Sequence, residues 1–132
     1  MKHYEKYKTA EELHVPEIFD PIGNMIRFGF TEEIKVDEDG EEHTIQVGYC
    51  IPITGYIDYG HIKSQIIEYV YPQKDEFALL NNAVAALLKE RAGITAEQDE
   101  SIEEDIQAFM EFNEWRDIAA QAARDLVNKF KQ

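Results

Sequence analysis

The sequence predicts an α+β fold, in which an N-terminal β-hairpin is followed by a helical half. Three observations carry this prediction. Apolar residues alternate over Met25–Val36 and again over Thr44–Ile53, as they do in strands. After Gly55 the apolar spacing becomes helical. A long apolar stripe of helical period then runs to the C-terminus, and no repeat or low-complexity segment divides the chain, so we expect one domain over residues 1–132.

The first half is expected to consist of an arm and a hairpin. Residues 1–24 are predicted to be mostly irregular, because prolines at 16 and 21 interrupt helices, with a short helical turn at Thr9–Leu13. The hairpin occupies residues 25–54 and reverses at Asp37–Gly40, where glycine accepts a positive φ and aspartate bonds to the local backbone. The apolar face of its second strand comprises Ile45, Val47, Tyr49, Ile51 and Ile53.

The helical half, residues 57–132, is expected to hold a short helix and an antiparallel helix pair. The short helix presents Tyr59, Ile62, Ile66, Tyr69 and Val70 on one face and ends at Pro72. Asp75 is expected to cap the second helix, which ends before Gly93. Its apolar stripe comprises Phe77, Leu80, Val84, Leu87 and Leu88. Ser101 and Glu104 have the spacing of a capping box at the start of the last helix.

Charge and composition exclude several classes of function. The chain of 132 residues has 27 acidic and 13 basic residues, a formal net charge of −14, and no basic stripe, so we expect no direct nucleic-acid binding. Its apolar runs are too short for a membrane span. Residues 1–8 are not followed by an apolar segment, so we expect no secretory signal. A single cysteine, Cys50, excludes an internal disulfide and fits a reducing compartment.

No catalytic, cofactor or metal-binding residue is predicted. The four histidines, at positions 3, 14, 43 and 61, do not have the clustered spacing of zinc ligands. A nucleophile pair of Cys50 and His61 is conceivable, but Cys50 lies in an apolar strand, where a buried, inert thiol is favoured. Asp37, Asp39 and Gly40 lack the spacing of a calcium loop and indicate a solvated turn. The acidic pairs at 75/76 and 103/104 lie near helix starts and are interpreted as caps.

Aromatic residues supply the candidate interface. Tyrosine and tryptophan are enriched at the centres of protein interfaces, but they are also ordinary core residues with one polar atom. For Phe109 and Phe112 we favour the core. The candidate interface residues are Tyr56, Tyr59, Tyr69, Tyr71 and Trp115, for which both interpretations stay open.

The helical half resembles small phage and prophage accessory proteins that are encoded near tail and virion genes. The resemblance rests on three features: the segment 61–82, with a helix ending in Tyr-Val-Tyr-Pro; the spacing of Phe109, Phe112, Trp115 and Arg116; and the charged hairpin over Glu32–Val47. It departs from that pattern in a longer Ala-rich connection over 83–92. These are packing motifs, so the resemblance implies protein partners and no catalytic residues.

The leading hypothesis is therefore a non-enzymatic phage structural or assembly protein. It would bind virion or tail proteins through its N-terminal arm and an aromatic helical face, in the virion or the host cytoplasm, and self-association stays open. The alternative is an acidic inhibitor that mimics nucleic acid and binds a host DNA-binding enzyme, since a strong field of one sign steers oppositely charged partners. That alternative is disfavoured because thirteen of the acids lie in two short windows, 32–42 and 97–105, which indicate turns and caps.

Overall fold

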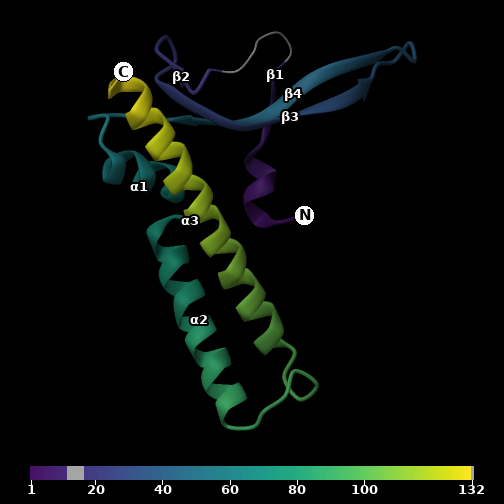
Figure 1. Cartoon of the computed structure of the whole chain (residues 1–132). Helices are drawn as coiled ribbons and strands as arrows, with labels where there is room; N and C mark the ends of the chain where they lie inside the picture. Colours follow the sequence, from purple (N-terminus) through teal and green to yellow (C-terminus); the bar gives the residue numbers. More distant parts are fainter. Residues whose placement is uncertain (12–16, 132) are drawn as a thin grey trace.

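The computed structural model describes residues 1–11 and 17–131 and has the predicted α+β architecture, a four-stranded antiparallel sheet followed by three helices (Figure 1). The elements in chain order are the 3₁₀ helix η1 (His3–Tyr7), the strands β1 (Thr9–Glu11), β2 (Phe19–Asp20), β3 (Met25–Val36) and β4 (Glu42–Pro52), and the helices α1 (Tyr59–Val70), α2 (Gln73–Arg91) and α3 (Ser101–Lys131).

The prediction of an irregular arm over residues 1–24 is wrong. The arm supplies η1 and both edge strands of the sheet, whose order is β1-β4-β3-β2. Thr9–Glu11 is a strand paired with Gln46–Gly48 rather than a helical turn, and Leu13 lies outside the described residues. The reason is tertiary: the central hairpin strands carry unpaired backbone groups at both edges, and these short segments satisfy part of them.

The predicted hairpin is confirmed, and it contains one irregularity. Strands β3 and β4 pair from Met25↔Pro52 to Val36↔Glu42, with a register shift between Phe28 and Thr31. Two residues of β3, Gly29 and Phe30, thus oppose the single residue Gly48. Gly29 has φ +67°, the left-handed conformation that such a bulge uses, and the Phe30 ring lies directly over Gly48.

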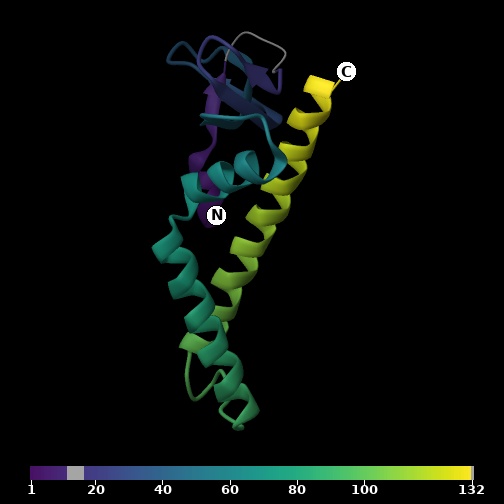
Figure 2. The same cartoon turned by 90° about the vertical axis from the view of Figure 1, so that its left-hand side faces the viewer.

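The core lies between the sheet, α1 and the C-terminal half of α3 (Figures 1 and 2). Trp115 is at its centre, because its side chain has no exposed surface and its ring contacts Tyr4, Phe28 and Tyr49. The buried cluster comprises Tyr4, Ile26, Tyr49, Ile51, Ile53, Ile62, Ile66, Ile67, Val70, Tyr71, Phe112, Trp115, Ala119, Ala122, Ala123 and Leu126.

Helix α2 and the N-terminal half of α3 form an antiparallel hairpin that projects away from the sheet (Figures 1 and 2). Helix α2 begins directly after Pro72, so the expectation that Asp75 caps it is wrong, and Asp75 lies in its first turn. Proline is well suited to a helix start because the first N–H groups have no partner within the helix. Helix α2 ends at Arg91, and Gly93 follows with φ +88°, as predicted.

Candidate functional site: an uncovered helical face

The predicted apolar stripe of α2 lies on the surface of the projecting hairpin. We call its residues the α2 stripe: Phe77, Leu80, Val84, Leu87 and Leu88. Their side chains are 46–63% exposed. Contiguous exposed apolar residues of this size are uncommon on monomers and mark interaction surfaces. The α2 stripe is therefore the leading candidate site in the described part of the chain.

A different face of α2 packs against α3. Ala83 and Ala86 are buried there, and Leu79 is partly buried beside them. The small side chains at this contact allow α2 and α3 to pack closely. The larger apolar residues of α2 lie on its other face. The helix thus has two apolar faces, an inner one of small residues and the outer α2 stripe.

The α2 stripe has the spacing of a helix-pairing seam. Phe77, Leu80, Val84 and Leu87 are separated by three, four and three residues, which corresponds to the alternating a and d positions of a coiled coil. Leu88 broadens the seam on one side, and Arg91 occupies the next a position. A seam of this kind favours another helix as its binding partner.

A shallow groove extends the α2 stripe towards α3. Its volume is about 270 Å³, and its walls include Phe77 and Leu80 from α2 and Phe109 and Phe112 from α3. The Arg116 guanidinium lies 5.8 Å from the centre of the Phe112 ring, at the rim of the groove. The groove adds aromatic contact area at the end of the hairpin nearer to the sheet.

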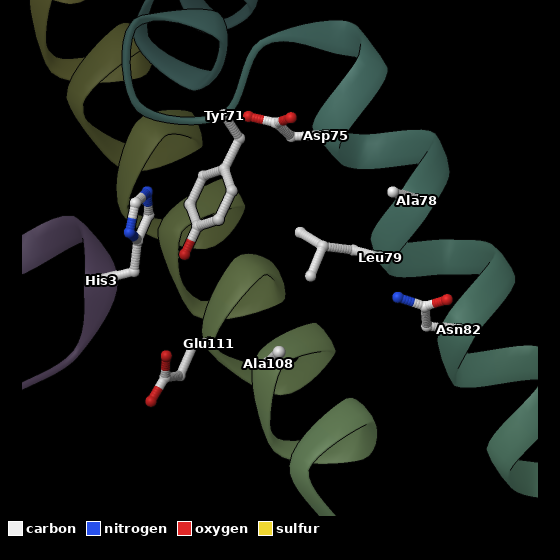
Figure 3. Close-up of a pocket in the computed structure, with 8 residues that line it drawn as sticks. All are labelled: His3, Tyr71, Asp75, Ala78, Leu79, Asn82, Ala108 and Glu111. Carbon is white, nitrogen blue, oxygen red and sulfur yellow. The ribbon is translucent and has the colours of Figure 1, made fainter. Parts of the chain in front are cut away.

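A second cavity lies on another side of the α2–α3 pair (Figure 3). It measures about 390 Å³ and is lined by His3, Tyr71, Asp75, Ala78, Leu79, Asn82, Ala108 and Glu111. Burial raises the pKa of the Tyr71 hydroxyl to about 12, and the Glu111 carboxylate adds to this shift. The Tyr71 hydroxyl oxygen is buried and has no hydrogen-bond partner among the residues that the structure describes.

The polar groups of this cavity serve separate roles. The His3 ring packs against Tyr71, with 5.0 Å between ring centres, and its Nε2 lies 3.4 Å from the carbonyl oxygen of Val70. Asp75 and Glu111 bring two carboxylates to the cavity from α2 and α3 (Figure 3). In the described part of the chain no hydrogen bond joins any two of the side chains that line this cavity.

The hairpin turn brings together a histidine and two acids that sequence spacing did not connect. Ligand atoms of Asp37, Glu41 and His43 all lie within 4.8 Å of one another. One Asp37 oxygen lies 2.7 Å from His43 Nε2, and the other accepts hydrogen bonds from the N–H groups of Asp39 and Glu41. The bond from His43 and these backbone bonds hold the pKa of Asp37 below its ordinary value. These groups could coordinate a divalent cation, but the Asp37 carboxylate already closes the turn through its bonds to His43 and to two backbone N–H groups.

The predicted interface residues differ in how far they are exposed: two are buried and three lie at the surface. Trp115 and Tyr71 are 0% and 5% exposed, so the interpretation of these two as surface anchors is corrected: both are core residues. Tyr56 and Tyr69 are exposed, at 86% and 44%, and Tyr59 is half-buried beneath the Arg124 guanidinium. These three tyrosines do not belong to the α2 stripe, and their role as contacts stays a prediction.

His61 is held by a local contact. Its Nε2 lies 2.8 Å from the carbonyl oxygen of Thr54, in the loop before α1. This contact of Nε2 helps to position the loop. In a nucleophile pair, a ring nitrogen of His61 would instead lie beside the Cys50 thiol.

Within the described residues no helix combines the length and apolar character needed to cross a bilayer. Comparison of the chain with protein-family models, with curated proteins and with solved structures finds no match.

Proposed function

We propose that this chain is a non-enzymatic assembly protein that binds other proteins through the α2 stripe. The observation that carries the proposal is the exposure of five large apolar side chains along one face of a projecting helix. Removing such area from water stabilises a complex by about 25 cal/mol per Å² before the costs of association. The protein partners we favour are virion or tail components, following the resemblance of the helical half to phage accessory proteins.

The positions of the acidic residues favour this function over nucleic-acid mimicry. The two acidic windows, 32–42 and 97–105, lie at the β3–β4 turn and at the α2–α3 connection, at opposite ends of the molecule (Figures 1 and 2). A mimic of a phosphate backbone needs charges along one continuous face. Separate acidic ends instead suit solubility and helix capping, and they leave the α2 stripe as the surface for a partner.

The test is capture of partners by the full chain and by two variants. The double variant Leu80→Glu/Leu87→Glu places carboxylates in the stripe, whereas the control Ile34→Glu alters an equally apolar side chain on β3 that is 69% exposed. We expect wild type and control to retain the same virion or tail proteins from a lysate at high salt, and the double variant to lose them. Capture that is independent of the stripe, or that high salt abolishes, would contradict the proposal.

A further inference from the structure

We propose that the partner docked on the α2 stripe is a second copy of this chain, whose α2 packs antiparallel to the first, so that each α2 lies between its own α3 and the partner's α2. This inference rests on the proposed function, because it names the occupant of the same surface. It follows from three properties of the hairpin: the number of helices it contains, the spacing of the stripe, and the distribution of charge along α2.

Helix α2 has one more apolar face than it has helical neighbours. A helix that packs against two neighbouring helices needs two apolar faces. Helix α2 has two such faces, but its only helical neighbour in the hairpin is α3, which covers the face with Ala83 and Ala86. The α2 stripe is the face that remains for a helix from another chain. A second hairpin supplies such a helix and brings an identical unsatisfied face with it.

The spacing of the stripe is self-complementary in an antiparallel arrangement. Antiparallel seams place each a residue opposite a d residue. When the two copies of α2 run in opposite directions, Phe77 meets the partner's Leu87, and Leu80 meets the partner's Val84. By symmetry the same two layers recur on the other side of the two-fold axis, so all four seam residues are paired at once. Shifting the register by one heptad leaves two of the four seam residues without a seam partner, either Phe77 and Leu80 or Val84 and Leu87.

The charge of α2 also fits a second copy. The whole chain carries −14, so two copies repel over most of their surfaces. Helix α2 is an exception, because Gln73–Arg91 contains three acids and three bases. The acids Asp75 and Glu76 lie in the first turn, and the bases Lys89 and Arg91 lie in the last turn. Lys89 already pairs with Asp99 at 2.8 Å, so Arg91 is the base that an antiparallel partner's acidic end meets, and the antiparallel arrangement also aligns the helix dipoles favourably.

The first experiment measures the association of the purified full chain by sedimentation as a function of concentration. We expect a reversible dimer for wild type and for the control Ile34→Glu. In Leu80→Glu/Leu87→Glu the dissociation constant should rise by more than about 100-fold, since the symmetric interface receives four buried carboxylates. Circular dichroism of the variant checks that its helices are retained, which we expect because both positions are about half exposed, at 46% and 57%.

A distance measurement tests the orientation. A nitroxide label is attached at Lys74→Cys in a Cys50→Ser background, and the distance between the two labels is measured by pulsed electron spin resonance. In the antiparallel register the two positions are separated by 16 residues along the paired helices, or about 24 Å at 1.5 Å per residue. Parallel helices would place them about 10 Å apart. The longer distance supports the antiparallel α2 pair, and the shorter one overturns it.

The outcomes separate this inference from the proposed function. A chain that stays monomeric but captures another protein through the stripe overturns the second copy and leaves the docking function standing. A monomer that captures no protein through the stripe overturns both. A dimer whose dissociation constant is the same in wild type and in Leu80→Glu/Leu87→Glu shows that the copies associate elsewhere, and it overturns the inference.

Discussion

Replacing Trp115 with alanine tests the assignment of this side chain to the core. Its indole is fully buried, stacks on the Tyr4 ring at 5.4 Å between centres, and meets the edge of the Tyr49 ring at 4.9 Å. Its Nε1–H donates a hydrogen bond of 3.1 Å to the carbonyl oxygen of Ile66 in α1. The side chain therefore links η1, the sheet, α1 and α3, and its removal should weaken all of these contacts together.

The expected loss is about 4 kcal/mol of unfolding free energy. Truncating a buried aromatic residue to alanine costs about 3–5 kcal/mol, which combines lost transfer energy with the cavity left behind. The lost hydrogen bond adds about 1 kcal/mol at most, because the Ile66 carbonyl can still accept the intrahelical bond from Val70. With a urea m-value of about 2 kcal/mol per molar, the unfolding midpoint should fall by about 2 M. Domains are stable by only about 5–15 kcal/mol, so this loss is a large fraction of the total.

Urea unfolding followed by far-ultraviolet circular dichroism is the suitable assay, because Trp115 is the only tryptophan and its removal also removes the indole fluorescence. Tyr56→Ala is the matched control, since that aromatic ring is 86% exposed and its truncation should change stability by less than about 0.5 kcal/mol. An unchanged midpoint for Trp115→Ala together with lost partner binding would refute the core assignment and restore the surface interpretation.

Three further predictions concern single polar or glycine positions. Tyr71→Phe should leave the urea midpoint unchanged or raise it, because it removes a buried hydroxyl without a partner among the described residues; a loss above about 1 kcal/mol would reveal a hydrogen bond to that group. Hydrogen bonds from Lys89 and then from the Ser101 hydroxyl and N–H lower the pKa of Asp99 from 3.8 to about 2, so the stabilising contribution of Asp99 is present above pH 3.8 and is lost as the pH falls towards 2. In thermal melts at several pH values, the loss of stability between pH 3.8 and 2 should therefore be smaller in Asp99→Asn than in wild type, since Asp37 and Glu114 contribute to it in both proteins. Gly48→Ala should be destabilising in urea, because its Cβ would lie 2.7 Å from the Phe30 ring; an equal midpoint would show that the ring moves freely.

Elements with a sustained local period were predictable from the sequence. The hairpin and three helices follow from alternation, helical spacing and the turn and proline signals, which act within a few residues. The edge strands β1 and β2 were not predictable, because segments of three and two residues have too little pattern of their own. Their structure comes from pairing with β4 and β3, and for β1 the partners lie more than thirty residues away in sequence.

The candidate site was only partly predictable. Periodicity identified the apolar face of α2, but it cannot say which of two apolar faces a neighbour covers; that depends on how closely Ala83 and Ala86 let α3 approach. The spacing of apolar residues also could not show whether Trp115 lies in the core or at an interface, since an apolar helix face has the same period in both cases. The approach of His43 to Asp37 depends on the hairpin register, which sequence patterns specify weakly at an exposed turn.

The bulge at Gly29 divides the β3–β4 hairpin into two parts that should open independently. On the sheet side, neighbouring strands and the helical core cover the ladder. Beyond the bulge, no third strand in the described chain pairs with residues 31–36 or 42–45, and Ile34 and Val36 are exposed. An isolated two-stranded ribbon is only marginally stable. Backbone amides of residues 33–36 and 42–45 should therefore exchange their hydrogens through opening of this ribbon alone, whereas those near Ile26 and Ile51 should exchange only when the whole domain unfolds.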